Sequence, residues 1–372
     1  MTIADRVERV RTRLAGTGTV APEAMLVSDL SNIRWLTGFT GSNGWVLFSH
    51  DRLTLITDGR YGRQAARQLA DAGVEGDVLV GATAAATLEH IAACCRHFGN
   101  VAFEAAHVTF AQHAQYVGAL KSTLVPVTGV VESERRTKDD SEIEKMAEAC
   151  RVADQALADV VGIAGVAVGQ TEAQVRDRLE ISMRELGASG PSYETIVATG
   201  PINAALPHHR PTATRIEAGQ TVIIDVGALV DGYHSDMTRT YFMGEPTPLQ
   251  RELYEVVLAA QRAGVAAVAA GMSTKELDGV CRDIISAAGY GEWFTHGTGH
   301  GVGLLIHEEP FVNRASDAIL QVGDVVTVEP GVYHEGFGGI RIEDLVVVTS
   351  DGCRVLTNSP KDSPCLPSQP TI

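Results

Sequence analysis

The sequence contains no long uninterrupted hydrophobic run, no paired-cysteine motif and no excess of positive charge. Its longest stretches without a formal charge, residues 195–209 and 293–307, are interrupted by glycine, proline, asparagine or histidine. They fall short of the roughly 18–20 apolar residues of a membrane span, so we predict no membrane association. Residues 1–14 alternate charges with valine and leucine, which predicts an amphipathic helix rather than a signal peptide.

Cysteine usage and charge exclude further classes of protein. The six cysteines include no CxxC pair, which predicts reduced thiols in a cytoplasmic protein. The chain has 30 Lys+Arg against 46 Asp+Glu, a formal charge of −16, and this sign repels phosphate backbones, so we expect no nucleic-acid partner. The 372 residues, 45% of them hydrophobic, suffice for two or three globular domains at roughly 150 residues each.

Residues 24–131 alternate short apolar runs with helical patterns. The predicted strands are 24–28, 44–48, 53–58, 77–80 and 101–103. The predicted helices are 60–72, 85–98 and 110–120. Alternation of strand and helix is typical of a small α/β domain.

A dense run of charges, ESERRTKDDSEIEK (132–145), follows this region. Its simplest interpretation is the solvated first turn of a helix. Because it is nearly free of apolar residues, it also marks the expected domain boundary. We therefore predict an α/β N-terminal domain over 1–131 and a second domain over 132–372.

The second region repeats itself. Four helix starts have capping-box spacing, in which a hydroxyl and a later acidic or amide side chain each satisfy a backbone amide. These pairs are Ser141/Glu144, Thr171/Gln174, Thr247/Gln250 and Ser273/Glu276. The segment GQTVIIDVG (219–227) aligns with GDVVTVEPG (323–331), and GYHSD (232–236) aligns with GIRIE (339–343). Each half thus contains two helices and then strands bearing two acids, which predicts two lobes related by a pseudo-twofold axis.

The strand pattern brings the acids of the first half together. Residues 222–227 and 233–242 predict a β-hairpin. In the expected register, Asp236 lies opposite Gly227 and on the same face as Asp225. Such diagonal neighbours are about 7–8 Å apart at the backbone and their side chains can converge. Like charges this close are costly unless a cation or a proton lies between them.

The second half supplies an equivalent pair of acids and a histidine. Glu329 and Glu343 follow the same strand pattern, and His300 lies in the glycine-rich segment HGTGHGVGLLIHEEP, where backbone can approach a ligand closely. Four acids and one imidazole suit two divalent ions of Mn, Co, Zn or Fe, whereas an all-oxygen site would favour Mg or Ca. Two ions bridged by carboxylates generate a hydroxide at neutral pH and polarise a carbonyl, which predicts hydrolysis.

Two further histidines, His208 and His307, precede prolines and stand outside this set of five. Each is either a satisfied structural histidine or, beside a dimetal centre, a residue for oxyanion stabilisation or proton transfer. A GxSxG elbow and a Walker phosphate loop are both absent from the sequence. No pattern assigns a role to Tyr193 or His209.

The order Asp–Asp–His–Glu–Glu resembles that of the pita-bread metallopeptidases, which include methionine aminopeptidase, aminopeptidase P and prolidase. Residues 1–131, with WLTGFTGSNGW (35–45) and TDGRY (57–61), are similar to the creatinase/prolidase N-terminal domain. The resemblance implies an α+β fold: a pita-bread catalytic domain with an internal repeat, preceded by a smaller α/β domain. All five ligands are intact, which disfavours creatinase, because creatinase shares the fold but not the ligands.

Carried over by position, the resemblance implies a role for each metal-binding side chain. Asp225 would chelate one ion, and His300 and Glu329 the other. Asp236 and Glu343 would bridge both ions. The ions themselves would be two divalent metals, with Mn preferred and Co, Zn or Fe as alternatives.

The resemblance also implies catalytic roles. His208, in ATGPINAALPHHRPT (198–212), would contact substrate, and His307 would support the scissile carbonyl and the tetrahedral intermediate. Arg341, two residues before Glu343, would order the centre, and Glu329 would also shuttle protons.

The segments GSNG (41–44) and GIRIED (339–344) favour the Xaa-Pro group of this family. Its substrates are Xaa-Pro dipeptides (dipeptidase) or longer peptides with proline at the second position (aminopeptidase). An Xaa-Pro bond lacks the N–H that ordinary peptidases use, so it calls for a dedicated pocket. The resemblance further implies a homodimer. Two alternatives stay open: a methionine aminopeptidase-like hydrolase, and a catalytically inactive binding protein on the same fold.

Overall fold

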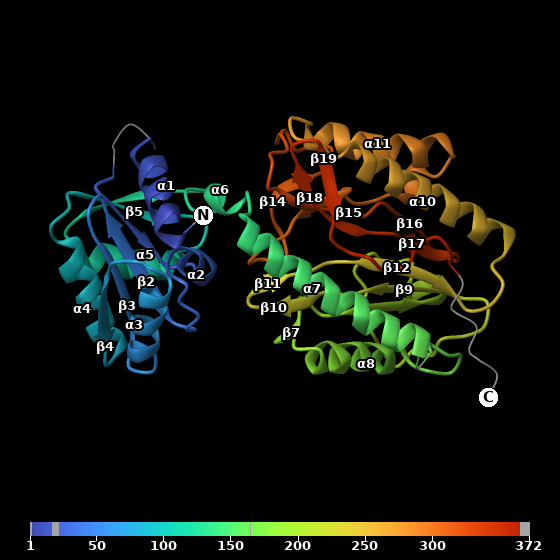
Figure 1. Ribbon diagram of the computed structural model, residues 1–372, viewed down its shortest axis with the longest axis horizontal. Helices are drawn as coiled ribbons and strands as arrows, with labels where there is room; N and C mark the ends of the chain where they lie inside the picture. Colours follow the sequence, from blue (N-terminus) through green and yellow to red (C-terminus); the bar gives the residue numbers. More distant parts are fainter. Residues whose placement is uncertain (1, 17–21, 164, 365–372) are drawn as a thin grey trace. The chain divides into compact units, whose positions relative to one another are not determined.

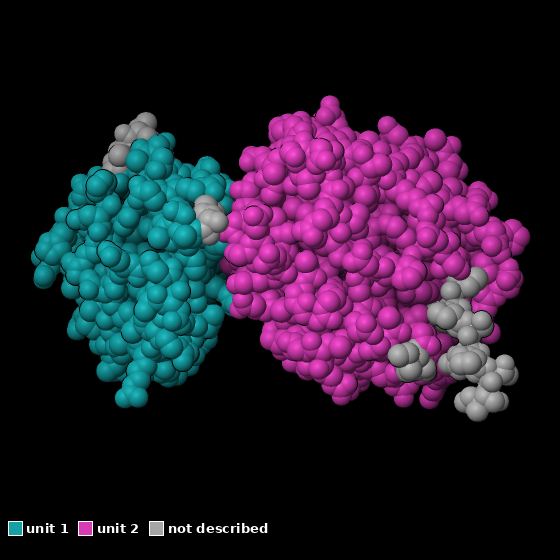
Figure 2. All heavy atoms as spheres, in the orientation of Figure 1, with its two compact units in different colours: residues 1–135 teal, residues 136–372 magenta. Residues whose placement is uncertain are grey.

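The computed structural model describes residues 2–16, 22–163 and 165–364 (Figure 1). The chain forms two compact units, Met1–Arg135 and Arg136–Ile372 (Figure 2). No helix among the described residues is both long and apolar enough to cross a membrane. The five cysteines within the described part of the chain are all free thiols.

The first unit is built on a mixed six-stranded sheet with the order β4-β3-β2-β1-β5-β6. Its strands are β1 (Ala24–Val27), β2 (Gly44–Ser49), β3 (Leu53–Asp58), β4 (Asp77–Gly81), β5 (Asn100–Glu104) and β6 (Thr123–Val127). Its helices are α1 (Ile3–Ala15), α2 (Leu30–Thr37), α3 (Gly62–Asp71), α4 (Ala84–Cys95), α5 (Phe110–Ala119) and α6 (Glu132–Arg135). The five strands and three helices expected for this region are present, and the amphipathic N-terminal helix is α1. The sequence patterns missed α2 and β6.

Two of the first charged residues of the run after this region are not solvated. Glu134 and Arg135 belong to the short helix α6, and both are buried. Glu134 pairs with Arg9 at 2.5 Å and with Arg13 at 2.6 Å, and Arg135 donates to Asn32. The interpretation as the solvated first turn of a helix is confirmed for the later residues of the run, because Asp140 and Glu144 are exposed at the start of helix α7 (Asp140–Ala158). It is wrong for Glu134 and Arg135, whose charges have partners far away in the sequence.

The second unit carries the internal repeat. Its helices are α7 (Asp140–Ala158), the π-helical turn η1 (Asp159–Ile163), α8 (Glu172–Glu185), α9 (Gly200–Asn203), α10 (Pro248–Ala267), α11 (Thr274–Ala287) and the 3-10 turn η2 (Gly291–Trp293). Its first-half strands are β7 (Gly190–Pro191), β8 (Ile196–Thr199), β9 (Thr221–Asp225), β10 (Ala228–Val230), β11 (Tyr233–His234) and β12 (Thr238–Phe242). Its second-half strands are β13 (Gly299–Gly301), β14 (Glu308–Val312), β15 (Val325–Val328), β16 (Gly331–His334), β17 (Gly338–Arg341), β18 (Asp344–Thr349) and β19 (Gly352–Val355).

Each half thus places two long helices before a set of strands. The first half forms the sheets β12-β9-β8 and β11-β10-β7, and the second half forms β14-β13-β15-β18-β19 and β16-β17. In Figure 1, α10 and α11 lie on one side of the strands of this unit and α8 lies on the other. Separate hydrophobic clusters fill the two halves, one under α7 and α8 and one under α10 and α11.

Three of the four expected capping boxes start helices as predicted, at Thr171, Thr247 and Ser273. The fourth begins two residues earlier than expected. The Asp139 carboxylate, rather than the Ser141 hydroxyl, accepts from the backbone N–H three residues later. Aspartate caps a helix as well as serine does, and the sequence offered both.

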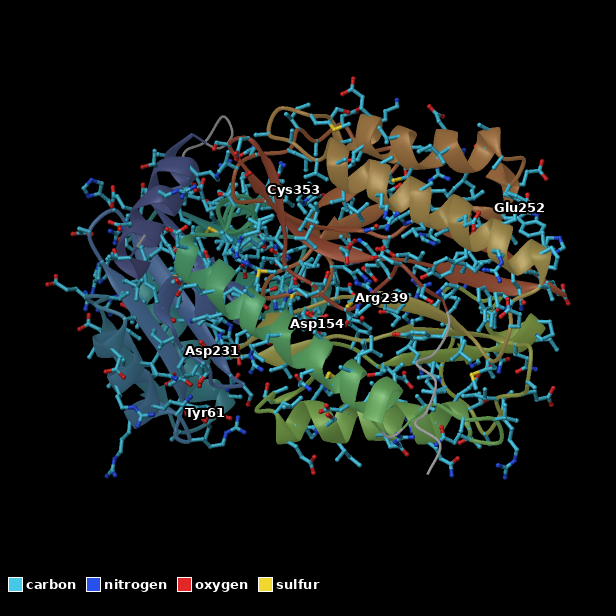
Figure 3. All side chains as sticks on the ribbon, turned by 45° about the vertical axis from the view of Figure 1, so that its right-hand side comes forward. Tyr61, Asp154, Asp231, Arg239, Glu252 and Cys353 are labelled. Atoms are coloured by element: carbon cyan, nitrogen blue, oxygen red, sulfur yellow. The ribbon has the colours of Figure 1, made fainter. Side chains whose placement is uncertain are left out.

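The end of the described chain is fastened to both halves of the repeat. The carboxylate of Asp154, which projects from α7 (Figure 3), accepts from the backbone N–H of Ser359 at 2.8 Å. The carbonyl of Ser359 in turn accepts from the buried guanidinium of Arg239 on β12. Arg239 also pairs with Asp344 at 2.9 Å. This network fixes the backbone beside Glu343, the residue that precedes Asp344.

Candidate functional site

The acids of the first half are placed by the β9–β12 ladder and the β10–β11 turn. Val230 pairs with Tyr233 across the turn, and Thr238 pairs with Asp225. This register puts Asp236 diagonally across from Asp225, as the alternation of side chains predicted. Gly227 allows the close approach, because a Cβ at this position would lie 2.0 Å from the carbonyl oxygen of Ser235.

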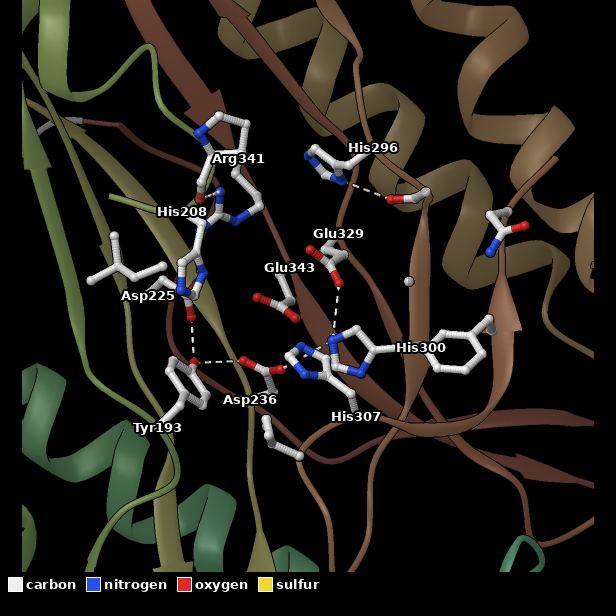
Figure 4. Close-up of a pocket in the computed structure, with 17 residues that line it drawn as sticks. Tyr193, His208, Asp225, Asp236, His296, His300, His307, Glu329, Arg341 and Glu343 are labelled. Carbon is white, nitrogen blue, oxygen red and sulfur yellow. Dashed lines mark hydrogen bonds and ion pairs between the residues drawn. The ribbon is translucent and has the colours of Figure 1, made fainter. Parts of the chain in front are cut away.

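Three carboxylates converge at this point from both halves of the repeat. Asp225, Asp236 and Glu343 each offer an oxygen, and these atoms lie within 4.8 Å of one another. Asp236 is 5% exposed and Glu343 is 2% exposed. The hydroxyl of Tyr193 lies between the two aspartates, 2.5 Å from Asp236 Oδ1 and within hydrogen-bonding distance of Asp225 (Figure 4).

His300 and the fourth acid complete the cluster. His300 Nε2 lies 3.3 Å from Glu329 Oε1 and 3.5 Å from Asp236 Oδ2. Its Nδ1 lies 3.1 Å from the carbonyl of Gly301, which favours the tautomer that leaves Nε2 available as a ligand. Thr327 donates to Glu329 Oε1 at 2.9 Å and orients it. Asp236 therefore stands between the Asp225 side and the His300 side of the cluster.

The electrostatics of this cluster call for a cation. Burial, and then the neighbouring carboxylates, raise the pKa of Asp236 and of Glu343 well above the ordinary values. Burial acts in the same direction on Glu329, but the hydrogen bond and charge of His300 outweigh it and lower its pKa to about 2. Buried like charges of this kind hold either protons or metal ions. Four carboxylate groups and one imidazole in contact suit transition-metal ions, so the donor set fits the expected pair.

Arg341 connects the cluster to its surroundings. Its Nη2 donates to Asp225 Oδ2 at 2.7 Å, and its Nε donates to Thr238 Oγ1 at 2.9 Å. Thr238 connects Arg341 to a second acid of the cluster, because its hydroxyl donates to Glu343 Oε2 at 2.7 Å. The Nη1 of Arg341 donates to the hydroxyl of Tyr333 at 2.7 Å and to the carbonyl of Pro207 at 3.0 Å.

All the expected site residues line one pocket of about 310 Å³ in the second unit. His208 and His307 are part of its wall, and the ring of His307 lies 4.4 Å, centroid to centroid, from that of His300. Burial, followed by the nearby His300, lowers the pKa of His307. Both histidines therefore stand beside the carboxylate cluster without belonging to it.

Tyr193, a candidate for the pocket wall to which no pattern gave a role, lines the pocket, and sequence patterns missed two further side chains of this site, His296 and Tyr333. His296 lines the pocket, and its Nε2 lies 3.0 Å from the hydroxyl of Tyr333. His296 lies in the same glycine-rich segment as His300, and this proximity was the available signal. Tyr193 and Tyr333 carried no signal, because nothing in their local sequence indicates which atoms they contact.

His209 is not among the residues that line the pocket, and it helps to anchor the loop that carries His208. Its Nε2 lies 2.9 Å from a carboxylate oxygen of Glu172, a fully buried residue in the first turn of α8. The same carboxylate accepts from the backbone N–H groups of Thr199 and Thr212 at 2.9 and 3.0 Å, and from the amide of Asn203 at 3.0 Å. The carboxylate of Glu172 therefore holds the two ends of this loop together.

A buried ion pair on α11 anchors the corresponding segment of the second half. Arg282 pairs with Asp278 at 2.8 Å and donates to the carbonyl of His296 at 2.7 Å. Asp278 also accepts from the backbone N–H of Thr298 at 3.0 Å. The segment leading to His300 is thus fixed to a helix, as is the loop of His208.

Comparison with family models finds two matches. The model described as metallopeptidase family M24 matches residues 144–350, and the creatinase/prolidase N-terminal domain matches residues 6–137. Together with similar solved structures, these matches confirm the expected fold class: a pita-bread catalytic domain preceded by a smaller creatinase-type domain.

Several relatives are similar over most of the chain. The "uncharacterized peptidase YqhT" of Bacillus subtilis is 40% identical over 350 residues, which cover 93% of this chain and 96% of the relative. Among solved structures, an Xaa-Pro dipeptidase from Bacillus anthracis is 38% identical with a TM-score of 0.93, covering 98% of this chain and 100% of the other. An X-Pro aminopeptidase from Thermotoga maritima is 33% identical with a TM-score of 0.85, covering 92% of this chain and 97% of the other.

Proposed function

This chain belongs to metallopeptidase family M24, and from that premise we propose that it hydrolyses the peptide bond between a residue and a following proline. The observation that carries the proposal is the meeting of four acids and one histidine in a single pocket. Relatives described as Xaa-Pro dipeptidases and an X-Pro aminopeptidase support the choice of substrate.

Five side chains would hold two divalent metal ions. Asp225 would serve one ion, His300 and Glu329 would serve the other, and Asp236 and Glu343 would be shared. The position of Asp236, with one oxygen near Tyr193 and the other 3.5 Å from His300, supports a shared role. Ions of this type, when bound, act as Lewis acids and lower the pKa of water, which is the chemistry that amide hydrolysis requires.

The protein's own groups handle protons and orientation. Glu329 is ionised at neutral pH, since its pKa is lowered to about 2, and in this form it can accept a proton from water and deliver it to the leaving proline nitrogen. His307 stabilises the oxygen of the scissile carbonyl, and His208 contacts the substrate from the opposite wall. Arg341 holds Asp225 in place by the 2.7 Å hydrogen bond.

Three finer features complete the proposal. Manganese is the metal that the resemblance to this family implies, with cobalt, zinc or iron as alternatives. The free state of the five described cysteines supports a reducing compartment, and we place the protein in the cytoplasm. The active form is a homodimer, which light scattering of the purified protein can measure.

The test is turnover by metal-reconstituted protein. Release of alanine from peptides that begin with Ala-Pro, with little release of methionine from Met-Ala peptides, is the expected result. Preferential cleavage of Met-Ala peptides would instead favour a methionine aminopeptidase-like enzyme. Tight binding of metal without hydrolysis of either class would favour the inactive binding protein.

A further inference from the structure

The charge of the pocket bears on the part of the substrate that lies beyond the proline ring. Resting on the proposed function, we infer that this enzyme prefers peptides that continue beyond the proline, or end there in a neutral group, over Xaa-Pro dipeptides with a free carboxylate. Phe311, on the pocket wall, is the position where this preference can be changed.

Covalent geometry fixes where a dipeptide's carboxylate would lie. The carboxyl carbon of proline is two bonds from its nitrogen, about 2.5 Å away. When the scissile bond lies over the cluster of acids, the free carboxylate of a dipeptide is therefore inside the pocket. In a longer peptide the same atoms belong to a neutral amide.

The wall available to these atoms is neutral. Ile196, Pro207, Ile306 and Phe311 supply apolar surface, and Asn313 supplies an uncharged amide. Asn313 Oδ1 already accepts from the backbone N–H of Ala315 at 2.9 Å, so its NH₂ group is the part that remains to donate.

Among the described residues that line the pocket, Arg341 carries the only permanent positive charge. The guanidinium that carries this charge is already engaged in hydrogen bonds within the protein. Arg341 is 3% exposed, and its guanidinium donates to Asp225, Thr238, Tyr333 and Pro207 at 2.7–3.0 Å. Four of the five N–H groups of the guanidinium are thus already engaged.

The histidines of the pocket do not replace a permanent cation. His296 has both ring nitrogens engaged, Nδ1 with the carbonyl of Gly297 at 2.7 Å and Nε2 with the hydroxyl of Tyr333 at 3.0 Å. His208 and His307 line the pocket as well, and their proposed roles are toward the substrate and the scissile carbonyl oxygen.

Two arginines nearby in sequence stand outside the lining set. Arg210 is exposed and pairs with Glu194 at 3.2 Å. Arg314, next to Asn313, is also exposed. Apart from the metal ions, a carboxylate brought into the pocket would thus lose water without gaining an unengaged charged side chain as a partner, whereas a neutral amide loses much less hydration.

The first experiment compares Ala-Pro, Ala-Pro-NH₂ and Ala-Pro-Ala as substrates of the metal-reconstituted protein at pH 8. The acid and the amide have nearly the same shape and differ in charge. We expect kcat/KM to be roughly tenfold or more higher for the amide and the tripeptide than for Ala-Pro, the size of effect of one charged hydrogen bond. Equal or faster cleavage of Ala-Pro overturns the inference. If none of the three is cleaved, the proposed function fails and this inference falls with it.

The second experiment adds the missing charge. Phe311 is 39% exposed, so an arginine there can keep its charge partly hydrated while reaching the pocket. Phe311→Arg should lower the ratio of kcat/KM for Ala-Pro-NH₂ to kcat/KM for Ala-Pro about tenfold. Phe311→Met, which introduces a neutral side chain of similar length, should leave this ratio near that of the wild type. Equal ratios in the two variants would count against a charge-based preference.

Discussion

Arg341 donates to Asp225 at 2.7 Å, and this contact joins a strand of the second half of the repeat to the acid cluster of the first. The guanidinium makes three other hydrogen bonds at the same time, a geometry that a lysine ammonium cannot reproduce. Arg341→Lys should therefore weaken metal binding or kcat/KM by roughly 10–100-fold. Metal affinity in a chelator competition is the measurement, with Arg354→Lys on exposed β19 as the control. Unchanged affinity and activity would remove Arg341 from the centre.

Asp236→Asn should separate metal binding from folding. Loss of the shared ligand is expected to reduce turnover by more than about 100-fold, beyond the range for residues that only support a ligand. In the metal-free protein the same change removes one of several buried like charges, so the Tm should rise by about 2–4 °C. The stabilisation that added metal gives to the wild type should largely disappear.

Asp231→Asn is the matched control for this experiment. Asp231 lies on the exposed turn of the same hairpin, at a positive φ that asparagine also tolerates, and pairs there with Lys145. It should leave the metal content and the activity as they are. A fully loaded, active Asp236→Asn variant would refute the ligand assignment.

The stability of the metal-free protein should fall as the pH rises from 5 to 8. Burial and neighbouring acids raise the folded-state pKa of Asp236 and Glu343. The contribution of these two groups to the free energy of unfolding is therefore fully present below about pH 4, the ordinary carboxyl range. It is lost as the pH rises through their pKa values in the folded protein. Glu329 has the opposite effect, because its pKa is lowered to about 2. Its ionised carboxylate stabilises the folded protein, and this stabilisation is lost only in strong acid.

Thermal melts in EDTA across this pH range measure the effect. Asp236→Asn should flatten the slope, because one of the two raised groups is gone. With metal present the trend should weaken or reverse, since protons compete with metal for the same oxygens. A wild-type Tm in EDTA that is constant or rises with pH would contradict the expectation.

Glu172→Gln should impair catalysis indirectly, because Glu172 anchors the loop that carries His208. The glutamine amide would turn a donor toward groups that already donate, at a cost of about 1–3 kcal/mol. We expect the loop to loosen and kcat/KM to fall roughly tenfold, with metal content unchanged. Glu185→Gln, at an exposed position of the same helix, is the control. If Glu172 acts through His208, the double variant Glu172→Gln/His208→Ala should have nearly the same kcat/KM as His208→Ala alone. Additive losses of kcat/KM in the double variant would show that Glu172 does not act through His208.

Local patterns were sufficient for much of the fold. Short apolar runs predicted most strands of the first unit and the acid-bearing strands of the second, and capping boxes predicted the four long helices of the second unit. These signals depend on neighbours in the sequence. The other strands of the second unit, β7, β8, β10, β13, β14, β16 and β19, were not predicted. Strand β6 was missed, since Pro126 makes its run atypical and an edge strand tolerates a proline. Helix α2 was missed because it has only eight residues, although Asp29 and Gly38 cap its two ends.

For the site, periodicity and repetition alone were enough to group Asp225, Asp236, Glu329 and Glu343. The side chains around them were less predictable. Glu172 holds a loop more than 25 residues away in sequence, and Tyr193 reaches Asp236 across 43 positions. Contacts of this kind depend on tertiary packing, which a linear pattern does not encode.

The ligands are divided between the two halves of the repeat, and neither half holds a full set. Asp225 and Asp236 come from the first half, while His300, Glu329 and Glu343 come from the second. An ion held by these residues would therefore tie the two halves to each other as a removable cross-link, in addition to direct contacts such as the ion pair between Arg239 and Asp344.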